Sequence, residues 1–124
     1  MARKLSRKIQ ARKRLVRNQL SSLVLNGKVV TTLPKARVLK SEMEKMIHRV
    51  RKLEGISRTR MLAGLLYGGT VKKMEDECSN YKKVTLYKTT SRLGDGAPLG
   101  QVVIEKADAK ATKLKEVKAK NGNN

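Results

Sequence analysis

Apolar residues near the N-terminus recur at the spacing of a helix. From about Ile9 onward they fall on one helical face: Leu15, Val16, Leu20, Leu23 and Val24. Asn26 followed by Gly27 is typical of a helix C-terminus. Residues 28–32 are rich in β-branched side chains, which favours a short strand. The pattern therefore predicts a helix followed directly by a strand.

A longer apolar stripe predicts a second helix. Thr32 is placed to cap it, and Pro34 falls in its first turn, where a missing N–H does no harm. The stripe comprises Val38, Leu39, Met43, Met46, Ile47, Val50 and Leu53. Gly55 is expected to end the helix. We expect Leu39 and Ile47 to be buried in the core.

Two shorter helices are predicted next. Ser57 is placed to cap a third helix, which Gly68 and Gly69 would end. Its apolar residues are Met61, Leu62, Leu65 and Leu66. Thr70 would then cap a short fourth helix, whose apolar residues are Val71, Met74 and Cys78.

The remaining pattern predicts two strands. Residues 84–88 alternate between apolar and polar, residues 102–105 favour a second strand, and residues 89–98 form a long hairpin loop between them. The order is helix, strand, three helices and two strands, an α+β class in which helices cover a small sheet. We expect one domain over residues 1–106, including a basic segment at 1–14, and a flexible Lys/Ala-rich tail over residues 107–124.

The net charge of the chain predicts that this small folded domain has a polyanionic partner. The chain has 30 Lys and Arg against 10 Asp and Glu, a formal net charge of +20. Residues 1–41 contain no acid. An ordinary solvated helix face mixes both signs of charge, so this segment favours nucleic-acid binding, since guanidinium groups pair with phosphate oxygens and release counterions. Aromatic residues are only 2% of the chain, too few to favour base stacking.

The candidate RNA-binding residues follow from this charge. The N-terminal segment contributes Arg3, Lys4, Arg7, Lys8, Arg12, Lys13, Arg14 and Arg17, of which we expect Arg7, Arg12 and Arg17 to be exposed without RNA. Lys35 and Arg37 add to the same field. Arg58 and Arg60 are expected in the first turn of the third helix, where an anion would relieve their conflict with the helix dipole. Beside the hairpin loop, Lys88 and Arg92 are candidates for contact with the RNA backbone.

Residues with catalytic or metal-binding chemistry do not form a site. His48, the only histidine, has basic neighbours and no Asp, Ser or Cys placed for a catalytic relay. The acids at 75–77 are consecutive and therefore point in different directions around a helix. Cys78 has no Cys or His at metal-ligand spacing, and we interpret it as a buried thiol.

The glycine-rich segment at 94–100 is better explained by a turn than by nucleotide binding. It lacks the third glycine and following helix of the dinucleotide motif, and it lacks the Gly-Lys-Ser/Thr of a P-loop. No apolar run is long enough to predict a membrane span. We expect a protein that is not an enzyme and has no cofactor, metal or small-molecule substrate.

Several motifs occur in this chain at a specific spacing. Arg17-Asn18 is followed by Ser22-Leu23-Val24 and then by the run from Thr31 to Ala36. This spacing resembles, without a gap, that of a known family, bacterial large-subunit ribosomal protein number seventeen. The loop from Gly94 to Pro98 is similar to the family's late Gly-Asp-x-Ala-Pro motif, and Arg3, Leu5, Arg7 and Arg12 fit its basic opening. The resemblance covers roughly residues 3 to 106. The chain departs from the family at Ala11, where a histidine is usual, and at residues 80–83, which replace a glycine-rich stretch.

The resemblance implies a two-layer α/β domain that binds large-subunit ribosomal RNA and organises it through phosphate contacts from Arg and Lys. It implies a structural constituent of the large subunit, in the cytoplasm, present as a monomer beside neighbouring large-subunit proteins. From charge alone, a free nucleic-acid binder such as a nucleoid protein or an RNA chaperone is the alternative. A DNA reader would need a recognition helix after a tight turn, and no convincing one is present in the sequence.

Overall fold

A computed structural model describes residues 4–107, so Arg3 and most of the predicted tail lie outside the described residues. The first helix, α1, spans Ile9–Asn26. It ends as predicted: Gly27 adopts a left-handed conformation with φ of 80°, and its N–H donates to the Leu23 carbonyl at 2.8 Å. Strand β1, Lys28–Thr32, follows at once.

Helix α2 spans Leu33–Lys52 and has Pro34 in its first turn, as the sequence predicts. Two details of its ends were predicted wrongly. Thr32 occupies the N-cap position, but its side chain makes no capping hydrogen bond. The helix ends at Lys52, and Gly55, with φ of 60°, belongs to the turn that starts the next helix. A glycine with positive φ serves a sharp reversal as well as a helix end, and the sequence pattern does not distinguish the two uses.

Helices α3, Gly55–Leu65, and α4, Gly68–Glu77, begin earlier than predicted. Ser57 lies inside α3, so it is not the cap. Gly68 and Gly69 begin α4, and they do not end α3. Thr70 also lies inside α4, where its hydroxyl donates to the Tyr67 carbonyl at 2.6 Å. Glycine lowers stability mainly in the middle of a helix, through its conformational entropy, so it is tolerated in a first turn.

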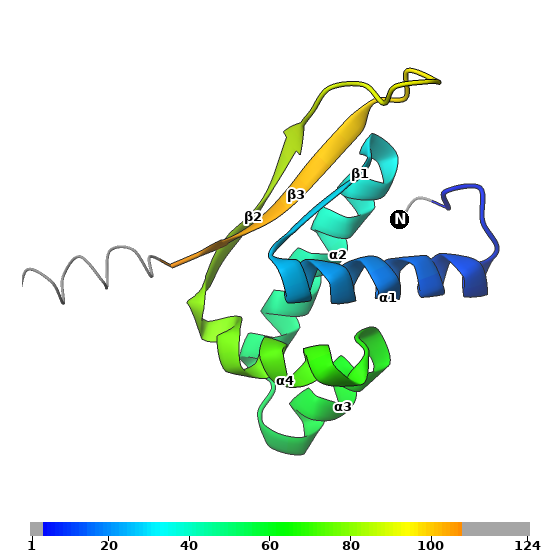
Figure 1. The fold of residues 1–124 in the computed structure, drawn as a ribbon. Helices are drawn as coiled ribbons and strands as arrows, with labels where there is room; N and C mark the ends of the chain where they lie inside the picture. Colours follow the sequence, from blue (N-terminus) through cyan, green and yellow to red (C-terminus); the bar gives the residue numbers. More distant parts are fainter. Residues whose placement is uncertain (1–3, 108–124) are drawn as a thin grey trace, which may run out of the picture.

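A 3-10 turn at Cys78–Asn80 leads into strand β2, Tyr81–Lys88, which pairs antiparallel with β3, Leu99–Lys106. The sheet order is β1-β3-β2, and β1 also pairs antiparallel with β3. Both long strands extend beyond their predicted bounds because pairing with a neighbour recruits residues that lack a clear alternation. The hairpin and its loop at 89–98 are confirmed (Figure 1).

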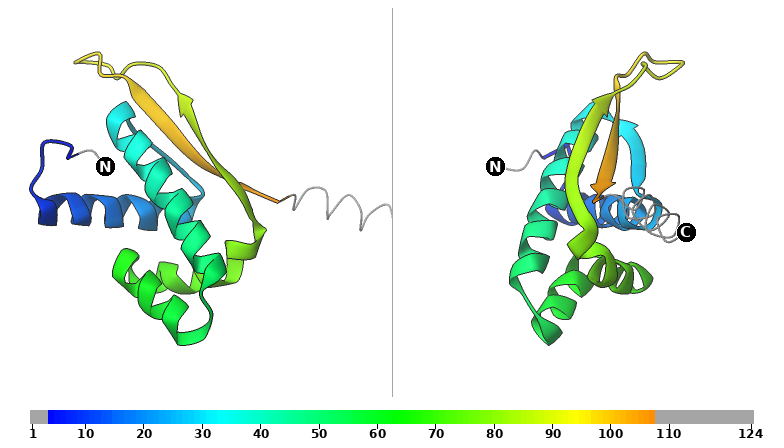
Figure 2. Two further views of the ribbon diagram at one scale, coloured as in Figure 1. Left: turned by 180° about the vertical axis from the view of Figure 1, so that it is seen from behind. Right: turned by 90° about the vertical axis from the view of Figure 1, so that its left-hand side faces the viewer.

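The α+β order and two-layer arrangement are confirmed. Helix α2 covers one face of the sheet and contacts all three strands. Helix α1 packs against α2 and β1, and α4 contacts both α1 and α3 (Figure 2). Leu39, Ile47 and Cys78 are buried, as predicted. The core consists mainly of Leu20, Leu23, Val24, Leu39, Met43, Met46, Val50, Leu62, Leu66, Met74, Tyr81, Val84, Val102 and Ile104. Among the described residues, no helix is long and apolar enough to span a membrane.

Candidate nucleic-acid interface

The basic half of α1 extends beyond the hydrophobic core. All four buried residues of α1 lie between Leu20 and Val24, whereas its first turns carry the predicted cations. The N-terminal half of α1 extends away from α2 and the sheet (Figure 1). Arg12 is half-buried, and the other described cations before residue 15 are exposed: Lys4, Arg7, Lys8, Lys13 and Arg14. No acid lies in the first turn of α1, so the positive end of the helix dipole adds to these side chains. The arrangement favours an anionic partner.

Arg17 does not share this exposure, and the expectation that it is free without RNA is wrong. One terminal guanidinium nitrogen donates to the Ala63 carbonyl at 3.2 Å and to the Leu66 carbonyl at 3.1 Å. The guanidinium lies 4.4 Å from the centre of the Tyr67 ring. Its Nε atom is buried and has no partner among the described residues. Arg17 therefore holds α1 against the end of α3.

Tyr67 adds to this contact between α1 and the end of α3, which we call the Arg17 joint. Its hydroxyl donates to Asn18 Oδ1 at 2.7 Å, and its backbone N–H donates to Ser21 Oγ at 3.2 Å. Consecutive turns of α1 are thus bonded to the junction between α3 and α4. Sequence reasoning missed Tyr67, whose partners on α1 are more than 40 residues away along the chain.

A cleft of about 420 Å³ lies beside this joint. Its lining comes from α1, α2 and α3: Arg12, Lys13, Val16, Arg17, Leu20, Val38, Glu42, Gly64 and Leu65. The cations come from α1, and the apolar residues come from all three helices. The cleft separates the projecting half of α1 from the rest of the domain.

The candidates on α2 and α3 have different environments. Arg37 is exposed and Lys35 is half-buried near the start of α2. Arg58 is half-buried, and its Nε donates to the Leu53 carbonyl at 2.8 Å, so its guanidinium already has a partner within the protein. Arg60 is exposed but lies beyond the first turn of α3, which corrects its predicted place.

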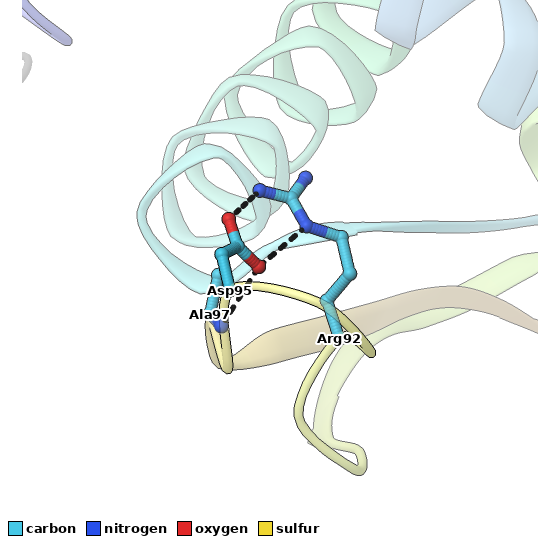
Figure 3. A network of polar contacts seen from close by, with 3 residues as sticks. All are labelled: Arg92, Asp95 and Ala97. Carbon is cyan, nitrogen blue, oxygen red and sulfur yellow. Dashed lines mark hydrogen bonds and ion pairs between the residues drawn. The ribbon is translucent and has the colours of Figure 1, made fainter.

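The hairpin loop contains an ordered ionic turn (Figure 3). Arg92 Nε donates to Asp95 Oδ1 at 3.0 Å, and a second guanidinium nitrogen bonds the other carboxylate oxygen. Asp95 Oδ1 also accepts the Ala97 N–H at 3.2 Å. The Arg92 hydrogen bond, followed by that of Ala97, holds the pKa of Asp95 well below its usual value. Arg92 is therefore engaged within the loop, while Lys88 is exposed at the end of β2.

Two carboxylates form ion pairs with lysines of the same chain. Glu77 bonds Lys106 at 2.8 Å; burial raises the pKa of Glu77, but the bond and charge of Lys106 outweigh it and leave that pKa below its usual value. Glu105 accepts a hydrogen bond from Thr85 at 2.7 Å and pairs with Lys83 at 3.5 Å. Within the described part of the chain, no group of acids, histidine or cysteine is placed to hold a metal.

Comparison with known proteins identifies the family. The sequence model of the ribosomal protein L17 family matches residues 15–107. The chain belongs to the ribosomal protein L17 family. Large ribosomal subunit protein bL17 of Thermus thermophilus is 35% identical over 108 residues, which are 81% of this chain and 91% of the relative. The protein of the same name from Moorella thermoacetica is 39% identical over 111 residues, 83% of this chain and 96% of the relative.

Membership in the L17 family confirms the resemblance read from the sequence motifs. It also supports the expectation that the chain is not an enzyme. The family match begins at Leu15, inside α1. It therefore includes the core, the Arg17 joint and the sheet, whereas the two exposed cations of α1, Lys13 and Arg14, precede it.

Proposed function

We propose that this protein is a structural component of the large ribosomal subunit that binds and organises ribosomal RNA through phosphate contacts. One observation carries the proposal: the first half of α1 projects from the core with exposed cations and no acid. Such a surface gains free energy by releasing the counterions condensed on RNA. The protein would act as a monomer in the cytoplasm, beside other large-subunit proteins.

We rank the candidate residues for this role by their exposure and by the bonds they already form. Exposed cations can approach phosphates without breaking an internal bond, and this group comprises Lys4, Arg7, Lys8, Lys13, Arg14, Arg37, Arg60 and Lys88. Arg12 and Lys35 are half-buried and would contact RNA at the edge of the surface. Arg17, Arg58 and Arg92 already bond the protein, so we assign them to positioning and expect them to add less to affinity. Arg3 remains a prediction from the sequence.

The first test is sedimentation of a tagged chain from a cell lysate through a sucrose gradient. We expect stoichiometric comigration with large subunits at low and moderate salt. Recovery in free or nucleoid fractions would refute the ribosomal placement and favour the free nucleic-acid binder.

A second test locates the surface. A variant with Arg7, Lys13 and Arg14 changed to Gln is titrated with protein-free large-subunit ribosomal RNA over a range of salt concentrations. Its slope of log affinity against log salt should flatten by about 0.7–0.9 for each phosphate that the variant no longer neutralises. The matched control changes Lys28, Lys52 and Lys72 to Gln, which removes the same charge from exposed positions elsewhere. Equal slopes in the two variants would show that the cations of residues 7–14 do not form the RNA-binding surface.

A further inference from the structure

A second basic surface lies on the far side of α2 from α1. A groove of about 230 Å³ runs between α2 and the edge strand β2. Four of its residues recur at i, i+3, i+4 and i+7 on α2, the spacing of one helical face. The lining consists of Glu44, Ile47, His48 and Arg51 from α2, and Lys82, Lys83 and Val84 from β2.

The groove has more basic than acidic residues. Three of its residues are Lys or Arg and a fourth is histidine, against one acid. That acid, Glu44, pairs with Lys40 at 3.7 Å, which offsets its charge. Lys83 pairs with Glu105, whereas His48 and Lys82 are exposed and take part in none of the ion pairs formed within residues 4–107. The groove therefore retains unpaired positive charge.

The edge strand β2 forms one side of the groove and holds Arg51 in position. Because β2 has a neighbour on one side only, part of its backbone is open on the other. A terminal guanidinium nitrogen of Arg51 donates to the Tyr81 carbonyl at the start of this strand. A guanidinium carries five N–H donors, so this bond positions Arg51 and leaves further donors for a ligand. One arginine is thus held in place beside a strand that carries two lysines.

We infer that this groove binds a second segment of RNA through its phosphate backbone, so that the protein joins two RNA segments. The inference rests on the proposed function and adds a site to it. Figure 1 shows α1 extending to one side of α2 and β2 lying on the other, so the two basic surfaces belong to elements on opposite sides of α2. A single rigid element, α2, contacts both α1 and β2 and sets their separation.

The chemistry of the lining favours backbone contact over base reading. No Phe, Tyr or Trp side chain lines the groove, so the large aromatic rings on which successive bases usually stack are missing from its lining. Its apolar residues, Ile47 and Val84, are buried, and the exposed groups are mainly cationic. Cations on a fixed surface suit the regular spacing of phosphates along an RNA helix.

The test is a capture assay with two mixed-sequence RNA duplexes. The full chain is bound to an immobilised duplex, and capture of a second, fluorescent duplex is measured. The groove variant changes His48, Arg51 and Lys82 to Gln. We expect it to bind the first duplex within about twofold of the native chain but to capture at least about fivefold less of the second. The control changes Lys28 and Lys72 to Gln, which removes the same formal charge, and should capture as the native chain does.

Each outcome decides a separate question. Capture by the groove variant equal to that of the control would overturn the inference and leave the groove for another partner, such as an acidic protein. Equal losses for both duplexes would also overturn it, because the groove would then not be a separate site. Failure of the proposed function is recognised differently, by an α1 variant that binds the first duplex as well as its own control. Since Arg51 also bonds Tyr81, a variant of His48 and Lys82 alone must show reduced capture with unchanged thermal unfolding.

Discussion

Replacement of Arg17 with Ala tests whether this arginine belongs to the fold or to the RNA surface. The change removes two hydrogen bonds to backbone carbonyls, at 3.2 and 3.1 Å, and the stacking on Tyr67 at 4.4 Å. A hydrogen bond from a charged donor contributes about 1.5–3 kcal/mol, and less where one partner is exposed, as at Ala63. A cation–π contact at an exposed ring adds about 0.5–1 kcal/mol.

One term acts in the opposite direction. Arg17 Nε is buried without a partner among the described residues, and its removal recovers part of that desolvation cost. We therefore expect a net loss of about 2 kcal/mol in the free energy of unfolding, which lowers the Tm of a domain this size by about 8–9 °C. Arg17→Lys should lose less stability than Arg17→Ala, because an ammonium keeps the positive charge. Some loss should remain, because an ammonium lacks the planar geometry of the guanidinium.

Urea unfolding followed by circular dichroism measures this loss, with Arg14→Ala as the matched control. Arg14 lies one turn earlier on α1 and is exposed, so its replacement should change stability by less than about 0.5 kcal/mol while weakening RNA binding. A loss for Arg17→Ala no larger than that of the control would refute the reasoning and return Arg17 to the RNA-binding surface.

Three further predictions concern the core and the hairpin. Leu39→Ala should lower the free energy of unfolding by about 2–5 kcal/mol, because the side chain is only 1% exposed; a loss below about 1 kcal/mol in urea unfolding would show a misassigned helix face. Gly100→Ala should cost about 1–3 kcal/mol in the same assay, because its Cβ would lie 3.0 Å from that of Ala36; an unchanged midpoint would show that α2 is free to shift. Asp95 has a depressed pKa in the folded chain, so the stability it contributes is present above its usual pKa of 3.8 and is lost only as pH falls through the lower, folded value. Nuclear magnetic resonance titration of its carboxyl carbon should show a midpoint below 3.8 that rises in Arg92→Gln, and equal midpoints in the two proteins would contradict the ionic turn.

The elements of the fold could be predicted because their signals are local. The apolar stripe of α2, the glycine after α1 and the β-branched run of β1 each act within a few residues. Helix boundaries were less predictable around Gly55 and Gly68. A glycine there can end one helix or open the next, and the packing of α3 and α4 decides which.

The candidate site was predicted in its charge and only partly in its residues. The acid-free N-terminal segment has exposed cations, as expected of its composition. Arg17 is an arginine of α1, as Arg14 is, yet the two side chains have different surroundings. The carbonyls and the ring that hold it come from residues 63–67, which lie next to α1 only after folding.

By itself, the sequence determined the order of the elements, the excess of positive charge and the family, because each depends on residue identity and short-range spacing. Only the tertiary structure decided which cations are available to a ligand and which bond the protein. It also created the groove of His48, Arg51 and Lys82, whose two sides are more than 30 residues apart in the chain. The physical reason is that burial and hydrogen bonding depend on neighbours in space, and α2 brings distant segments together on both of its sides.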